Sequence, residues 1–165
     1  MRALLLTLLL PCLSLYSQDF PAKSLGVRGG EMSGITYRHL KTDYTGSELL
    51  LSFRDDGLQA TFLRQKLRPT LGELGKNFWF VNGYGLHAGF TYENEFNVLF
   101  SRYIYEDKKL SPLLGVDGYL GLEYRFREIP LSMGIDYKPY FEFSGYDFFS
   151  IRLWDTAFMI KYNFD

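Results

Sequence analysis

The sequence is poor in the residues that stabilise small exported domains through cross-links or metals. Its 165 residues include one cysteine, Cys12, and two histidines, His39 and His87. A disulfide framework needs an even set of cysteines, and a zinc site needs several Cys or His ligands at short spacing. We therefore expect no cofactor and no metal, and expect stability to come from packing and backbone pairing.

Long apolar runs are also scarce, and the one near the N-terminus is too short for a transmembrane helix. Residues 3–15 are mostly apolar and follow Arg2, while Ser17 and Gln18 are small or polar. A basic start, a short apolar stretch and a small residue before the cleavage point are typical of a secretory signal peptide. The sequence predicts a signal peptide over residues 1–17 and a mature, cysteine-free domain over residues 18–165.

The chain also lacks any excess of charge. Its 18 Lys and Arg residues face 19 Asp and Glu residues, a formal net charge of −1. No basic run is present, so nucleic acid is not an expected partner. Aromatic residues are abundant instead, at 18% of the chain, which argues against a disordered protein.

Helical periodicity is nearly absent, and apolar and polar residues alternate instead. In the stretch 115–143, for example, Leu122 and Tyr124 alternate with Glu123 and Arg125. The same pattern predicts eight strands, at 24–40, 48–54, 58–66, 78–92, 96–105, 116–126, 131–143 and 150–164. Short turns are expected at 55–57, 93–95 and 127–130, and longer connections at 41–47, 66–77, 106–112 and 144–149. Short turns at one end and longer loops at the other are typical of outer-membrane barrels.

Alternation alone does not say which side of the sheet faces inward. A soluble barrel points its apolar side inward, whereas a membrane barrel points that side to lipid. The apolar side carries large rings on nearly every strand, too many for the narrow interior of an eight-stranded barrel. The polar side is rich in Gly, Ser and Thr, which suit such an interior. The sequence therefore predicts an all-β fold, a closed antiparallel up-and-down transmembrane β-barrel of eight strands.

In this arrangement, charged residues of both signs point into the lumen. Charges in a narrow, low-dielectric interior must pair to be tolerated, so we expect a largely plugged lumen and no open pore. Aromatic residues near strand ends, Trp79 among them, are expected to form interfacial rings on the outside. The predicted lumen network consists of Arg28, Arg38, Arg54, His87, Asp117, Glu123, Arg125, Asp136, Lys138, Glu142 and Lys161.

Several stretches resemble a known family. They are "LGVRGG" and "GITYRH" within residues 25–39, "GVDGYLGLEYRF" at 115–126 and "MGIDYKP" at 133–139. Together with the signal peptide they resemble small outer-membrane β-barrel proteins that are common in Bacteroidota and have no assigned molecular function. The wider pattern is similar to the eight-stranded OmpA/OmpX type. The resemblance implies an outer-membrane barrel with periplasmic termini, and it carries no catalytic residues.

Two features depart from the pattern of this family, and Pro139 is a further local irregularity. The stretch "TYENEFNVLFSRYIYEDKK" at 91–109, after the Gly-rich strand, reads as strand more than loop, which leaves the bounds of the fifth strand open. Asp165 follows Phe164, whereas outer-membrane barrels usually end on an aromatic residue. Pro139 cannot donate a hydrogen bond to the ladder, so we expect it at a bulge or at the outer rim of its strand.

The sequence offers few candidates for catalysis. His87 could form a hydrolase triad with Ser52 or Ser132 and Asp117, but no nucleophile-elbow spacing supports this, so no catalytic residue is assigned. The leading hypothesis is a non-enzymatic outer-membrane barrel with a structural or surface-interaction role. The alternatives are an outer-membrane enzyme that modifies lipid or lipopolysaccharide, and a soluble lipocalin-like barrel that binds an apolar ligand. Expected partners are outer-membrane lipid, lipopolysaccharide and, during biogenesis, the barrel assembly machinery; the chain is expected to be a monomer.

Overall fold

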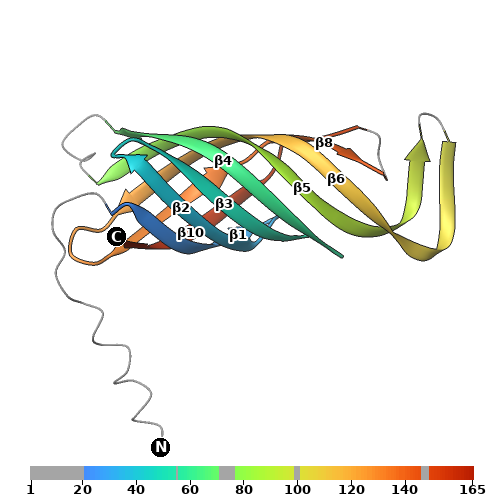
Figure 1. Ribbon diagram of the computed structural model, residues 1–165, viewed down its shortest axis with the longest axis horizontal. Coiled ribbons are helices and arrows are strands. Elements are labelled where there is room, and N and C mark those ends of the chain that lie inside the picture. The colour runs from blue at the N-terminus through green and yellow to red at the C-terminus, as the bar shows by residue number, and fades with distance from the viewer. Residues whose placement is uncertain (1–20, 55, 71–76, 99–100, 146–148) are drawn as a thin grey trace, which may run out of the picture.

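The computed structural model describes residues 21–54, 56–70, 77–98, 101–145 and 149–165, with the backbone alone for 93–98 and 101–108. This part of the chain is built from strands and the turns between them (Figure 1). No helix among these residues is long and apolar enough to cross a lipid bilayer. The predicted signal peptide, residues 1–17, lies outside the described residues.

The strand segments form one closed sheet. They are β1 (Lys23–Gly30), β2 (Gly34–Thr42), β3 (Thr45–Arg54), β4 (Gly57–Pro69), β5 (Phe78–Val98), β6 (Ser101–Arg125), β7 (Leu131–Tyr137), β8 (Tyr140–Ser144), β9 (Ser150–Arg152) and β10 (Thr156–Phe164). Neighbours pair antiparallel in the order β5-β4-β3-β2-β1-β10-β7-β6, and pairing of β5 with β6 closes the barrel. The predicted closed antiparallel barrel is confirmed.

Ten segments make eight barrel strands because two of the strands are interrupted. β7 and β8 form one strand that keeps a single register against β6 on both sides of Pro139. The Gly118 N–H donates to the Pro139 carbonyl over 2.8 Å, but Pro139 has no N–H with which to return the bond. On the other side, residues 153–155 oppose only residues 138–139, which makes a bulge between β9 and β10. Pro139 therefore lies opposite a bulge.

Two of the predicted strands are wrong, and the two errors cancel in the count of eight. The stretch 24–40 is two strands, β1 and β2, joined by a turn at 31–33. The predicted strand 96–105 does not exist as a unit, because its first part ends β5 and its last part begins β6. Consequently the turn predicted at 93–95 and the connection predicted at 106–112 both lie within long strands.

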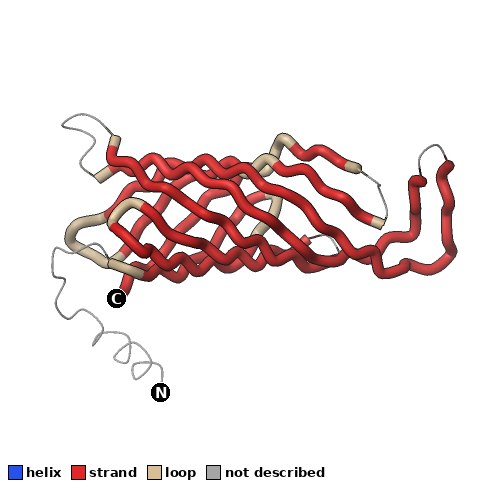
Figure 2. The backbone as a smooth tube through the Cα atoms, turned by 45° about the horizontal axis from the view of Figure 1, so that its top comes forward, coloured by secondary structure: helices blue, strands red, loops and turns tan. Residues whose placement is uncertain are grey.

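The turns are also distributed differently from the prediction. The end of the barrel where β1 begins and β10 finishes, here called the termini end, carries the connections 43–44, 70–77 and 126–130. The opposite end, here called the hairpin end, carries 31–33, 55–56, 99–100 and 145–149. Short and long connections are therefore mixed at both ends. At the hairpin end β5 and β6 continue together past the barrel and bend away from it (Figure 2).

Side chains alternate between the two surfaces of the sheet. Over most of the barrel apolar groups lie outside and charged groups inside, whereas at the termini end Leu63, Trp79 and Val81 form part of a buried apolar cluster. Leu25 and Ile135 on the outer wall are 50% and 59% exposed, whereas Glu123 and Lys138 are 1% and 0% exposed. Successive residues of a strand point to opposite faces, so each strand contributes to both surfaces. The outcome is an apolar exterior around a polar interior, the reverse of a soluble barrel.

Candidate functional site

The interior of the barrel brings the predicted charged residues together. All eleven side chains of the predicted lumen network contact at least one group of opposite charge, with His87 counted as a cation. Nine of them are buried, and Arg54 and Arg125 are partly buried. They fall into two groups at different heights along the barrel.

The first group, here called the termini-side cluster, consists of Arg38, Glu48, Glu123, Arg125 and Lys161. Arg38 bridges two carboxylates, since its Nε lies 2.8 Å from Glu48 Oε2 and its Nη1 lies 2.6 Å from Glu123 Oε2. Lys161 Nζ lies 2.7 Å from Glu48 Oε2, and Arg125 Nε lies 2.9 Å from Glu123 Oε1. Each carboxylate of the cluster is therefore held by two cations.

The termini-side cluster crosses the whole lumen. Arg38 is on β2 and Glu123 is on β6, and these strands are four positions apart in the eight-stranded ring, on opposite walls. Thr36 adds a hydroxyl that donates to Glu48, and Trp79 covers the Arg125 guanidinium at 5.1 Å from the ring centroid. Trp79 is therefore inside the barrel, buried with Leu63 and Val81, and its predicted place in an outer aromatic ring is wrong.

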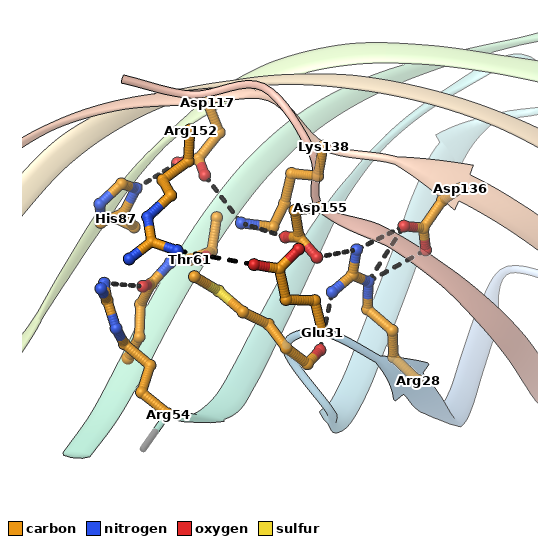
Figure 3. A network of polar contacts seen from close by, with 12 residues as sticks. Arg28, Glu31, Arg54, Thr61, His87, Asp117, Asp136, Lys138, Arg152 and Asp155 are labelled. Carbon is orange, nitrogen blue, oxygen red and sulfur yellow. Dashed lines mark hydrogen bonds and ion pairs between the residues drawn. The ribbon is translucent and has the colours of Figure 1, made fainter. Parts of the chain in front are cut away.

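The second group, here called the hairpin-side cluster, consists of Arg28, Arg54, His87, Asp117, Asp136, Lys138, Glu142 and Asp155. Figure 3 labels all of these residues except Glu142. Arg28 lies at one end of the cluster, with Nη2 2.6 Å from Asp136 Oδ1 and 3.0 Å from Asp155 Oδ1. Lys138 continues the chain, since its Nζ lies 3.3 Å from Asp155 Oδ2 and 3.0 Å from Asp117 Oδ1. These contacts connect four strands of the barrel: β1, β6, the strand formed by β7 and β8, and the strand formed by β9 and β10.

The chain of contacts then runs through His87 to Arg54. His87 Nδ1 lies 2.8 Å from Asp117 Oδ2, and its Nε2 lies 3.2 Å from Glu142 Oε2. Arg54 closes the chain by pairing with Glu142 from the opposite wall, since β3 and β8 are four positions apart in the ring. Both ring nitrogens of His87 face carboxylate oxygens, an arrangement that a doubly protonated imidazolium satisfies with two N–H donors.

Irregularities of the backbone place several members of the hairpin-side cluster. Asp155 ends the bulge at 153–155 with its carboxylate inward, and Lys138, next to the interrupted ladder at Pro139, lies opposite it. Gly115 lies directly opposite the His87 ring: a Cβ at that position would be 2.4 Å from His87 Cε1. Only glycine leaves room for the imidazole there.

Two charged members of the clusters were not predicted. Glu48 lies on the same side of β3 as Arg54, and Asp155 lies on the same side of its strand as Lys161. Counting alternate residues from Arg54 or from Lys161 would therefore have predicted that Glu48 and Asp155 point into the lumen. Asp155 is the last residue of the bulge at 153–155, so the bulge does not alter its relation to Lys161.

The triad considered for His87 is not assembled among the described contacts. The pair of His87 with Asp117 is present, but the second ring nitrogen faces Glu142, where a triad would need a hydroxyl. The Ser132 hydroxyl instead contacts Asn163 at 3.5 Å, and Ser52 Oγ is buried. Among the described residues, no group of three or more His, Cys, Asp or Glu side chains has the arrangement of a metal site.

The fold has a counterpart among solved structures. The chain is similar to the crystal structure of the N-terminal β-barrel domain of Pseudomonas aeruginosa OprF, with a TM-score of 0.59 and 12% sequence identity over 88% of this chain and 100% of that one. At this identity the likeness establishes a shared eight-stranded barrel fold. No protein family profile matches the chain, and no curated protein matches it in sequence.

Proposed function

We propose that this protein is an integral barrel of the bacterial outer membrane, with a lumen plugged by ion pairs and a structural or surface-interaction role rather than an enzymatic one. The OprF-like fold supports the outer-membrane location. The finer resemblance to the Bacteroidota-type family stays a prediction. We propose lipid and lipopolysaccharide as its surroundings, the barrel assembly machinery as its partner in biogenesis, and a monomeric state.

The observation that carries this proposal is the reversed placement of apolar and charged side chains. An outer wall of Leu, Ile and Phe side chains that are about half exposed would be unstable in water, because apolar area costs roughly 25 cal/mol per Å² when hydrated. Lipid removes that cost. A soluble barrel for an apolar ligand needs the opposite arrangement, with its apolar side chains lining the interior.

Two ion pairs that join opposite walls support a plugged lumen. Arg38–Glu123 and Arg54–Glu142 span the ring at different heights. Opening a path between the walls would separate buried charges, and an unpaired buried charge costs about 3–5 kcal/mol. A permanent pore would need both bridges broken, so the resting barrel should not conduct ions.

Membrane fractionation and electrophoresis test the location. The protein should sediment with outer membranes, resist extraction by salt, and migrate faster on a gel before boiling than after, because a closed barrel resists detergent. Recovery as a soluble protein after lysis without detergent would contradict the proposal. Planar-bilayer recording tests the plug separately, since a steady large conductance would contradict it and leave the membrane location intact.

A further inference from the structure

One sector of the outer wall is basic rather than apolar. It lies at the termini end, over β2, β3 and β4. The alternation on β4 changes there, because the outward residue Phe62 is followed on the same side by Arg64, Lys66 and Arg68. Lys41 is exposed on β2 near the same rim. Lys41, Arg64, Lys66 and Arg68 are here called the basic face.

The pairing register makes the basic face continuous across three strands. Thr45 on β3 pairs with Lys66 on one side and with Thr42, next to Lys41, on the other. Ser47 likewise pairs with Arg64 and with His39. The side chains between the cations are thus short hydroxyls, which leave the ammonium and guanidinium groups accessible.

The rest of the same rim is aromatic. Phe78 and Tyr124 pack with ring centroids 4.9 Å apart, and Tyr124 and Phe126 with centroids 5.0 Å apart. Tyr162 and Phe164 stack on the strand beside β1. The outer wall at the termini end is therefore two-sided, with rings over one sector and cations over the other.

The cations of the basic face differ from the interior cations in forming no ion pair with a described residue, although the exposed Asp43 lies in the turn between β2 and β3. Every cation of the two lumen clusters pairs with a carboxylate, whereas no ion pair joins any basic-face residue to another of the described residues. From Arg64 to Arg68 the strand rises about 13 Å, or about 10 Å along the axis of a tilted barrel. This matches the depth of a leaflet's headgroup layer, about 5–8 Å, plus the reach of snorkelling side chains.

We propose that the basic face binds the phosphate groups of anionic phospholipids in the leaflet at the termini end, so that the barrel holds anionic lipid preferentially along β2–β4. This inference rests on the proposed membrane location. Charge complementarity favours anionic lipid. The basic face attracts the net negative charge of an anionic headgroup, whereas a zwitterionic headgroup carries a positive group that the basic face repels. Each Lys or Arg near a membrane surface favours anionic lipid about fivefold.

The test is lipid selectivity in reconstituted membranes. The full mature chain is refolded into vesicles of equimolar phosphatidylcholine and phosphatidylglycerol, and spin-labelled forms of each lipid report their relative association with the barrel. We expect the wild type to prefer phosphatidylglycerol. Arg64→Gln, Lys66→Gln and Arg68→Gln together should lower the preference at least fivefold, and raised salt should lower it in the wild type.

A matched control removes the same number of cations elsewhere. Lys109, Arg127 and Arg152 are exposed, lie outside the basic face and are spread over both ends of the barrel, so their joint replacement by Gln should lower the preference much less than the triple change in the basic face. Equal selectivity in the wild type and both variants would overturn the inference. Normal insertion and heat-modifiable migration with no lipid preference would overturn this inference alone, whereas failure to insert into any vesicle would overturn the proposed membrane location.

Discussion

The two charged clusters inside the barrel are built differently. The termini-side cluster is compact, and its members sit where the local ladders are regular, with Arg38 reaching directly across the lumen. The hairpin-side cluster is a longer chain of contacts that depends on a bulge and an interrupted strand, and it ends on the partly buried Arg54. Where the ladders are regular, a single ion pair thus crosses the lumen directly. Where they are irregular, the carboxylates and cations form a longer chain of ion pairs.

Lys161 and Arg28, one cation from each cluster, differ in how many carboxylates they contact. Among the described contacts, Lys161 pairs with Glu48 alone. Arg28, by contrast, contacts both Asp136 and Asp155. The loss of Glu48 should therefore cost more than the loss of Asp155, because Arg28 and Lys138 each keep another carboxylate when Asp155 is lost.

Neutralising Glu48 should have the largest effect. Glu48→Gln removes the carboxylate of Lys161 and one of the two carboxylates of Arg38, and both cations are nearly inaccessible to water. Leaving a buried charge without its partner costs about 3–5 kcal/mol. The free energy of unfolding by urea in lipid vesicles should fall by about that amount, or the folded, heat-modifiable form should be lost.

The control for this variant is Glu128→Gln, at an exposed position in the turn after β6. It removes the same charge and should leave unfolding unchanged. A Glu48→Gln protein as stable as the control would show that the termini-side cluster does not depend on this carboxylate.

Neutralising Asp155 should have a smaller effect. Asp155→Asn leaves Arg28 with Asp136 and Lys138 with Asp117, so neither cation is isolated. We expect a loss of about 1–3 kcal/mol, the usual cost of weakening hydrogen bonds to charged groups. The same urea titration measures it. A loss as large as that for Glu48→Gln would remove the distinction between the two clusters.

Removing both partners of a bridge should cost less still. Arg54→Gln with Glu142→Gln deletes one cross-lumen pair without leaving a lone charge, and His87 keeps its contact with Asp117. We expect a loss of about 1 kcal/mol. Single-channel recordings should remain silent, because the Arg38–Glu123 bridge still spans the lumen. Steady conductance in this variant would show that the termini-side cluster does not seal the barrel.

The sequence predicted which side chains point inward because the alternation of a strand is a local property. A charge between two outward apolar residues, such as Glu123 between Leu122 and Tyr124, must face the interior whatever the strand pairs with. Eleven of the inward charges were predicted in this way, whereas Glu48 and Asp155 were missed. The closed membrane barrel was predicted from the same alternation and from the size of the aromatic side chains, which are too many and too large for the interior of an eight-stranded barrel.

The ends of the strands and the partners of the charged side chains are not local properties in this sense. Val27 and Ile35 are eight residues apart, an even number, so alternation continues through the turn at 31–33 and conceals it. At 93–95 the run "ENE" suggested a turn, but the strands there continue past the barrel as a ribbon. Which cation meets which carboxylate depends on barrel closure, since Lys161 and Glu48 are 113 positions apart in the chain.

The smallest effect is expected from an ion pair at the hairpin-end rim. Arg152 Nη1 lies 3.6 Å from Glu31 Oε1, and the side chains are 57% and 49% exposed. Water and salt screen such a pair, so Glu31→Gln should change the free energy of unfolding by no more than about 0.5 kcal/mol. Repeating the urea titration at low and high salt compares this pair with the interior. The effect of Glu31→Gln should vanish at high salt. The effect of Glu48→Gln should persist, because salt screens buried ion pairs far less. If salt reduced both effects equally, the termini-side cluster would have to be open to water and ions.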